Sequence, residues 1–193
     1  MRTILVCGIG ASGTSAVAGC LHKLGCPMGL PGHLDQGEHY EDICFYNAFT
    51  QPIDWDGLKR RIADHRQPPV WGWKNTLTIK AIPGILNYLK GPRIVAVHRS
   101  MTASIRGRRD GRCPPGVYYT QQQAETWAIE AMAEYMRALR IAQVPILHVG
   151  FEDLLAEPAK IVQELAHFAF YDLPSAPQIQ DAINHIDKDR VHA

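Results

Sequence analysis

The stretch ILVCGIGASGTS, residues 4–15, constrains the fold of this chain more than any other feature. It begins with four apolar residues of strand character and continues into a glycine-rich turn. The residues that follow, TSAVAGCLHKLG, place alanine, valine and leucine at helical spacing. A buried strand, a glycine-rich loop and a helix in this order are typical of a phosphate site. We therefore predict a phosphate-binding loop at this end of the chain.

Two phosphate-loop patterns overlap in these letters, and each implies a different ligand. Gly8, Gly10 and Gly13 spell the dinucleotide fingerprint G-x-G-x-x-G. That fingerprint requires an acid about 20 residues further on, at the end of a second strand, to bind the ribose hydroxyls. Asp35 stands near that distance, but it lies among glycine and proline residues with no strand before it. The dinucleotide interpretation is therefore the weaker one.

The same stretch also matches a Walker-type loop without its lysine, because position 14 holds threonine. Kinases of this class need that lysine on the terminal phosphates, and usually an acid after an apolar strand to hold magnesium. The apolar run 93–98 is followed instead by Arg99, and Glu152 and Asp153 after the last run are typical helix caps. The residues favour a phosphate held without a metal, by backbone N–H groups, loop hydroxyls and a helix N-terminus. A plain strand-to-helix turn capped by serine or threonine is the alternative.

Composition sets broad limits on the function. A chain of 193 residues is long enough for one domain with a real core, so we predict a single domain over 1–193. Twenty basic and nineteen acidic side chains leave a net charge of +1, which gives no indication of a nucleic-acid-binding surface. The five cysteines are odd in number and never form C-x-x-C, which argues against a disulfide framework or a zinc ribbon. With no targeting signal and no apolar run of about 20 residues, we expect a cytoplasmic protein without a membrane span.

Four short β-like runs alternate with helical sequence. They are apolar on both faces, which is typical of a parallel sheet covered by helices on both sides. The runs span residues 3–7, 69–73, 93–98 and 145–149. Helices are predicted over 37–49, 55–65, 118–142 and 157–171, and a loop over 111–119. We therefore predict an α/β, P-loop NTPase-like three-layer fold, with a central parallel sheet of about four strands flanked by helices.

The ends of the predicted strands indicate where a ligand binds, because ligands of open parallel sheets lie beyond the carboxyl ends. The residues at those ends are the glycine-rich loop, Lys74, Arg99, Glu152 and Asp153. Two cations and a phosphate loop are thus predicted to meet at one edge of the sheet.

Five segments, taken in their order along the chain, carry a family resemblance. GIGASGTSAVAGCLHKLGCPMG resembles a loop usually written G-x-x-[RK]-S-G-T-[ST], with the helix and turn that follow it. The later segments are GEHYEDICFYNAF, WGWKNTLT, RIVAVHRSMTASIRGRRD and FEDLLAEPAKIVQELAHFAFYDL. Together they resemble the sulfotransferases that use 3'-phosphoadenosine 5'-phosphosulfate (PAPS), in particular the small bacterial and phage-like members. The likeness covers about residues 3–173.

The resemblance implies where the donor binds. Its 5'-phosphosulfate would lie on the loop residues Gly10, Ala11, Ser12, Gly13, Thr14 and Ser15. Arg99 would pair with its 3'-phosphate, for which the planar, permanently charged guanidinium is well suited.

The resemblance also implies the residues that act on the acceptor. Glu41 matches a family glutamate and is the leading candidate to take the acceptor's proton, with His33, Glu38 and His39 as neighbours of suitable chemistry. We place Glu41 and Lys74 in the catalytic site. The aromatic residues have both packing and pocket interpretations: we expect at least one of Trp71 and Trp73 in the core, and Phe151 either near the adenine or in the core.

The chain departs from the family pattern at two positions. Ala11 stands where relatives have lysine or arginine, a cation that neutralises charge on the bridging oxygen; losing one such contact can cost ~10²-fold in rate. Lys74 is the candidate substitute. Gly107 stands where relatives often have serine, and Ser100, Ser104, Arg106 and Arg108 are candidates to replace it, of which we include Ser104 in the predicted site.

The sequence therefore predicts a sulfotransferase that moves a sulfuryl group from PAPS to a hydroxyl or amine of a small-molecule or glycan acceptor. Transfer would be in line and without a metal, driven by positioning and electrostatic stabilisation. Residues 27–67 and 108–120 are expected to shape the acceptor pocket. A P-loop kinase that uses ATP and magnesium is one alternative, and a non-catalytic nucleotide-binding protein, favoured by Ala11, is another.

Overall fold

A sheet of four parallel strands forms the centre of the computed structural model. The structure describes residues 1–29, 40–42, 45, 52–64, 68–76, 78–111 and 116–186. The strands are β1 (Arg2–Cys7), β2 (Val70–Lys74), β3 (Pro92–His98) and β4 (Ile146–Gly150), in the spatial order β2-β1-β3-β4. Each predicted strand is confirmed, with bounds that differ by at most one residue at either end.

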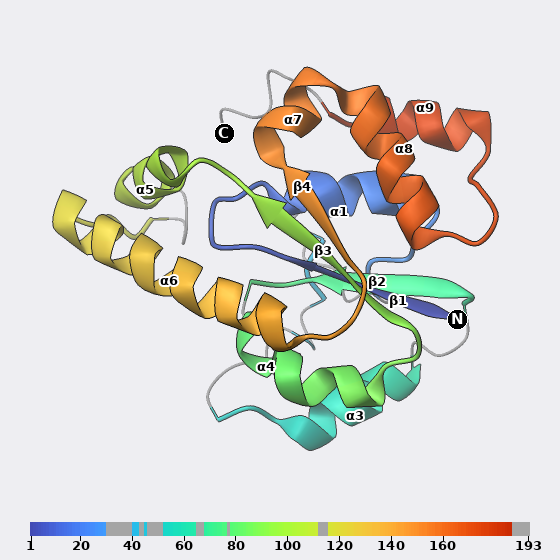
Figure 1. The fold of residues 1–193 in the computed structure, drawn as a ribbon, viewed down its shortest axis with the longest axis horizontal. Helices are drawn as coiled ribbons and strands as arrows, with labels where there is room; N and C mark the ends of the chain where they lie inside the picture. The colour runs from blue at the N-terminus through green and yellow to red at the C-terminus, as the bar shows by residue number, and fades with distance from the viewer. Residues whose placement is uncertain are drawn as a thin grey trace.

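Helices cover both faces of this sheet (Figure 1). They are α1 (Thr14–Lys23), α3 (Trp55–Asp64), α4 (Thr78–Ile85), α5 (Met101–Arg109), α6 (Gln121–Ile141), α7 (Phe151–Ala156), α8 (Pro158–Ala169) and α9 (Ala176–Asn184), with a short 3₁₀ helix η1 (Leu86–Tyr88). Helices α1, α7, α8 and α9 lie on one side of the sheet, and α3, α4 and α6 on the other (Figure 1). The predicted three-layer α/β fold is confirmed.

Alternation along the strands produces the two cores. Successive side chains of a strand point to opposite faces, so Ile4 and Val6 pack with α1 and α8, whereas Leu5 and Cys7 pack with α4 and α6. Both strand tryptophans belong to the second core. Trp71 and Trp73 are fully buried, and Trp73 stacks on Phe45 with ring centroids 4.3 Å apart. The expectation that at least one packs is confirmed, and both do.

The long helix α6 is anchored by one apolar stripe, as predicted. Tyr135 and Leu139 are buried, while Trp127 and Ala131 are partly buried against the same core. Thr120 begins the helix through a capping box with Gln123, in which each side chain bonds the other residue's backbone N–H. Helix α8 likewise begins where Pro158 predicts, at the first helical position.

The remaining predicted segments compare with the structure only in part. The predicted helix over 37–49 and the loop over 111–119 lie largely outside the described residues, which include only 40–42 and 45 of the first and 111 and 116–119 of the second. Periodicity predicted no residue range for the short helices α4, α5, α7 and α9, because helices of 6–9 residues carry only a weak periodic signal.

The strand register brings the carboxyl ends together. Val6 lies opposite Lys74, Cys7 opposite Ala96, and His98 opposite Gly150. The glycine-rich loop after β1 therefore stands between the end of β2 and the end of β3. Among the described helices, none is long and apolar enough to cross a membrane.

Candidate active site

The loop between β1 and α1 makes a tight turn with an unusual backbone conformation. Ala11 and Gly13 adopt left-handed conformations, with φ of 64° and 88°. Gly13 precedes α1 as its N-cap residue, and no side chain caps that helix end. The alternative of a turn capped by serine or threonine is therefore not what forms, and the first N–H groups of α1 have no capping side chain.

Two loop glycines are required by close packing. A Cβ on Gly8 would lie 2.4 Å from Ser12 Oγ and 2.7 Å from the Val97 carbonyl oxygen. A Cβ on Gly13 would lie 2.1 Å from the ring of Phe151, the first residue of α7. Phe151 is itself only 4% exposed, so its ring belongs to the core beneath the loop. The packing interpretation of this residue is the one that its burial supports.

Two serine hydroxyls of the predicted donor site are buried beside this loop. Ser12 and Ser104 are both fully buried, and within the described part of the chain neither Oγ has a hydrogen-bond partner. An unsatisfied buried hydroxyl costs about 1–3 kcal/mol and is rare in native proteins. Such groups are chemically suited to the oxygens of a phosphate or sulfate. Thr14 is also buried, and Ser15 is half-buried at the start of α1.

Glu41 and Lys74, the two predicted catalytic residues, form an ion pair. Lys74 Nζ lies 2.6 Å from Glu41 Oε1, and their side chains are 7% and 21% exposed. Lys74 ends β2, directly opposite Val6 of β1, so this pair lies beside the entry to the loop. The next residue, Asp42, is fully buried and pairs with Arg61 of α3, which fixes the Glu41 segment against that helix.

The strand-end Arg99 contacts the loop itself. Its Nη1 donates a hydrogen bond of 3.2 Å to the carbonyl oxygen of Ala11, and its guanidinium lies over the Phe151 ring, 4.8 Å from the centroid. The Arg99 guanidinium therefore lies near Ala11, the loop position at which relatives have a cationic side chain. Sequence reasoning missed this contact, because the two residues are 88 positions apart.

The two departures from the family pattern are spatial neighbours. A Cβ on Gly107 of α5 would lie 3.1 Å from the Cβ of Ala11. Gly107 and Ser104 are one helical turn apart and are both buried. Small residues at 11 and 107 thus allow α5 to approach the loop closely.

The four candidates to replace the missing serine differ in their positions and burial. Ser100 caps α5 by accepting from Ala103 N, and its own N–H donates to Glu152 Oε1 at 3.1 Å. Arg108 lies over Trp127 of α6, 3.9 Å from the ring centroid, and Arg106 is exposed. Ser104 is the fully buried one of the four, on the turn of α5 that approaches the loop. Glu152 and Asp153 lie in the first turn of α7, but Gly150 is its N-cap residue and no side chain caps that helix end, so the expectation that these acids are caps is wrong.

The structure also shows a pair of histidines, at the same edge of the sheet, that the sequence did not predict. His98 Nε2 and His148 Nδ1 are 2.7 Å apart, at the end of β3 and in β4. Burial, and then the neighbouring His148, lower the pKa of His98. Burial also raises the pKa of the Cys7 and Cys20 thiols to about 12, which makes them unreactive.

A cavity beside α6 includes one residue of the predicted acceptor region, Tyr119. A cavity of about 410 Å³ is lined by Tyr119, Gln122, Gln123, Thr126, Trp127 and Glu130. Tyr119 precedes α6 and the other five residues belong to the first half of that helix, which begins at the carboxyl side of the sheet (Figure 1). His33, Glu38 and His39 lie outside the described residues.

Comparison with known proteins gives structural likeness only. No protein-family model and no curated protein matches the chain. The fold is similar to the sulfotransferase domain from the curacin biosynthetic pathway, with a TM-score of 0.57 and 14% identity over 100% of this chain and 81% of that one. It is also similar to sulfotransferase STF1 from Mycobacterium tuberculosis H37Rv, with a TM-score of 0.59 and 15% identity over 95% and 71%. The deoxyadenosine kinase from M. mycoides, solved with bound dATP, gives a TM-score of 0.51 and 13% identity over 86% and 99%.

These likenesses define the class of fold. The chain has an α/β architecture shared with bacterial sulfotransferases and with a nucleoside kinase, and the resemblance inferred from the sequence segments holds at the level of structure.

Proposed function

We propose that this protein is a PAPS-dependent sulfotransferase acting on a hydroxyl or amine of a small-molecule or glycan acceptor. One observation carries the proposal: the glycine-rich loop, the buried Ser12 and Ser104, Arg99 and the Lys74–Glu41 pair gather at one edge of the sheet. These residues provide amides, hydroxyls and cations that can bind an anion, and the Glu41 carboxylate can accept a proton. The fold likeness to bacterial sulfotransferases supports the same class.

The donor would be held by the loop and by α5. The N–H groups at the start of α1 and the hydroxyls of Ser12 and Ser104 suit its anionic oxygens, and the helix dipole adds to this. Arg99 would supply the positive charge that Ala11 does not, while remaining near enough to α5 to meet a second phosphate. This chemistry fits a nucleotide with two separate anionic ends.

Transfer would then use the ion pair. As the acceptor oxygen or nitrogen bonds to sulfur, the bond from sulfur to the bridging oxygen breaks, and Glu41 takes the acceptor's proton. Lys74 would stabilise the charge that develops on the bridging oxygen, which becomes part of adenosine 3',5'-bisphosphate. The cavity beside Tyr119 and Trp127 is our candidate for part of the acceptor site.

A nucleotide kinase is the second candidate, because the fold is also similar to the M. mycoides deoxyadenosine kinase. Position 14 is threonine rather than lysine, and β3 is followed by Arg99 rather than by an acid, so the kinase chemistry has fewer of its usual parts. A non-catalytic nucleotide-binding protein is the third, on the strength of Ala11.

Calorimetry with matched nucleotides tests the proposal. The wild-type protein is expected to bind adenosine 3',5'-bisphosphate more tightly than adenosine 5'-monophosphate or ATP with magnesium. Arg99→Ala should weaken bisphosphate binding roughly 10- to 100-fold, the usual effect of losing a charged hydrogen bond, whereas the exposed Arg137→Gln on α6 should not.

The two roles of Arg99 give different outcomes. A loss confined to the bisphosphate assigns it to the 3'-phosphate, and an equal loss for the monophosphate assigns it to the loop side. Preferential binding of ATP with magnesium would favour the kinase, and binding of none of the three nucleotides would contradict the proposal.

A further inference from the structure

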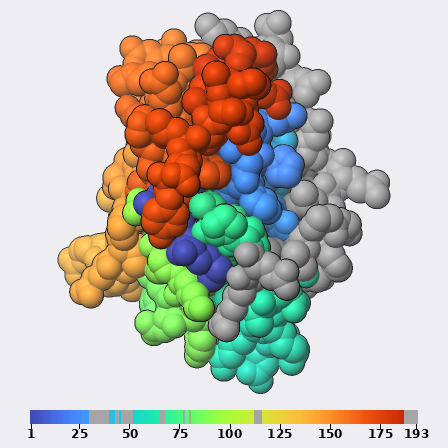
Figure 2. All heavy atoms as spheres, turned by 90° about the vertical axis from the view of Figure 1, so that its right-hand side faces the viewer, coloured from blue at the N-terminus to red at the C-terminus, as the bar shows by residue number. Residues whose placement is uncertain are grey.

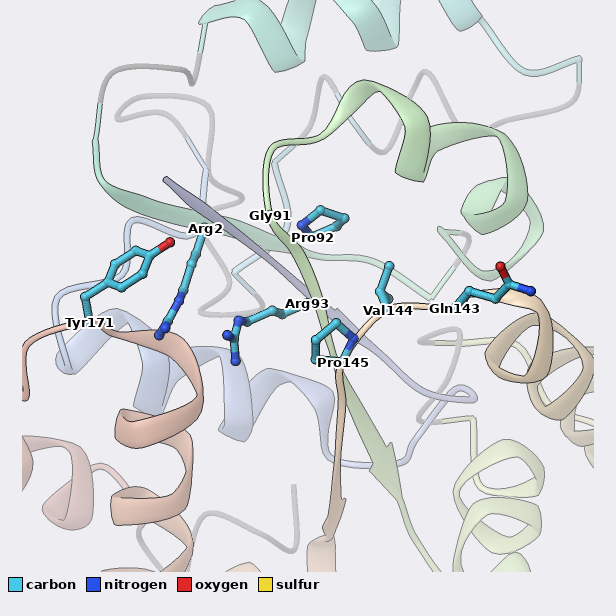
Figure 3. Close-up of a pocket in the computed structure, with 8 residues that line it drawn as sticks. All are labelled: Arg2, Gly91, Pro92, Arg93, Gln143, Val144, Pro145 and Tyr171. Carbon is cyan, nitrogen blue, oxygen red and sulfur yellow. The ribbon is translucent and has the colours of Figure 1, made fainter.

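Two arginines lie together at the amino edge of the sheet, opposite the candidate active site. Arg2 begins β1, and Arg93 lies in the adjacent β3, where it stands opposite Ile4. Both Nη1 atoms donate to the same carbonyl oxygen, that of Phe168 near the end of α8, at 3.4 and 3.1 Å. Arg2 donates to the Phe170 carbonyl as well. The two guanidinium groups are therefore close neighbours (Figure 3).

Among the described residues, no acid balances their positive charges. No ion pair of Arg2 or Arg93 occurs within the described part of the chain. Burial, and then the charge of Arg2, lower the pKa of Arg93. Uncompensated like charges in a partly buried setting are unfavourable, so a site of this kind attracts an anion.

Capping of α8 accounts for only part of this arrangement. Cations near a helix C-terminus stabilise its last carbonyls, and one nitrogen of each arginine does this. A guanidinium has five N–H donors, and Arg2 Nε is buried without a partner among the described residues. Donors remain that the carbonyls do not use.

A cavity adjoins the two arginines. It has a volume of about 260 Å³, and Pro92, Val144 and Pro145 provide its apolar wall (Figure 3). Tyr171 stands at its other side, with the Arg2 guanidinium 3.8 Å from the ring centroid. Figure 2 looks onto this side of the molecule, where the dark-blue first residues reach the surface between the orange-to-red C-terminal segments and the green ones. The cavity opens at a face remote from the loop.

We propose that this cavity binds a small phosphomonoester. The phosphate dianion would lie against the Arg2 and Arg93 guanidiniums, whose planar forks suit its oxygens. The organic group would lie on the wall formed by Pro92, Val144 and Pro145. Pockets for drug-sized ligands hold about 300–1,000 Å³, so the smaller volume here selects a small compound. This site is independent of the proposed sulfotransferase activity.

Amide chemical shifts in the ¹⁵N-labelled full chain test the site with phenyl phosphate as the probe. Saturable shifts are expected at Gly91, Arg93 and Val144, and they should persist in Arg99→Ala, which is expected to weaken binding at the loop site. Arg93→Gln should weaken this binding roughly tenfold or more. The matched control is Arg137→Gln, an exposed arginine of α6 that should bind as the wild type does.

Three results would overturn the proposal. Shifts confined to loop residues 10–15 would place the phosphate at the active site alone. Equal shifts with phenol would show an apolar cavity without anion recognition, a comparison that needs only the wild type. Unchanged affinity in a folded Arg93→Gln would remove the arginine from the site. The proposed function is tested separately, by the amide shifts of loop residues 10–15 when adenosine 3',5'-bisphosphate is added.

Discussion

Replacing Glu41 with glutamine is expected to destabilise the fold as well as slow the reaction. Glu41 Oε1 lies 2.6 Å from Lys74 Nζ, and the lysine side chain is only 7% exposed. At an effective dielectric constant near 20, two unit charges at that distance attract by about 6 kcal/mol before any cost of desolvation. Removing one partner of a buried pair typically costs about 3–5 kcal/mol, since the other charge stays buried. Because Glu41 is itself 21% exposed, we expect the lower end, about 3 kcal/mol.

A double-mutant cycle separates this pairing from general damage. Lys74→Met removes the stranded cation, so Glu41→Gln/Lys74→Met should recover most of the lost stability and lie within about 1 kcal/mol of the wild type. Urea unfolding followed by tryptophan fluorescence provides the measurement, because the fully buried Trp71 and Trp73 report on the core next to β2.

The surface pair Lys160–Glu157 is the matched control. Its atoms are 2.8 Å apart, but the side chains are 64% and 57% exposed, so its cycle should show little coupling. A coupling for Lys74–Glu41 no larger than for this exposed pair would refute the reasoning. Turnover of Glu41→Gln, measured at urea-free conditions where the variant is folded, tests its role as the base independently.

Two further predictions follow from close contacts at the same edge of the sheet. Gly107→Ser should cost about 1–3 kcal/mol through overpacking, because its Cβ would meet that of Ala11 at 3.1 Å. Chemical unfolding should show this loss of stability, whereas Ala103→Ser, at a half-buried position of the same helix, should be tolerated. Equal stability of the two variants would contradict the contact. The lowered pKa of His98 means that below its ordinary value of 6.5 the unfolded chain binds more protons than the folded one, so stability should fall as the pH drops below about 6.5. His98→Gln should flatten that slope and His167→Gln should not, and an unchanged slope in His98→Gln would show that the histidine pair does not titrate with folding.

The sequence predicted the sheet and the glycine-rich turn after its first strand because both depend on local patterns. Runs that are apolar on both faces can be satisfied only inside a covered parallel sheet, and the four strands lie where those runs stand. A glycine-rich turn between such a strand and a helix leaves few backbone choices, and Gly13 does adopt the left-handed conformation. The convergence of Lys74 and Arg99 on the loop edge could also be predicted, since every parallel strand ends at the same side.

The pairings within the site could not be read from the sequence. Glu41 and Lys74 are 33 residues apart, and Arg99 and the Ala11 carbonyl are 88 apart. The contact between positions 11 and 107 depends on how closely α5 approaches the loop. The two departures from the family pattern, Ala11 and Gly107, are therefore neighbours only in the tertiary structure.

Local sequence therefore determined which elements form and which chemical groups stand at their ends, because hydrophobic periodicity and glycine content act over a few residues. Tertiary structure alone decided which of those groups touch, and it brought Arg2 and Arg93 together over the end of α8. The physical reason is that strand register and helix packing fix distances between residues far apart in the chain. These distances, rather than residue types, decide which charges pair.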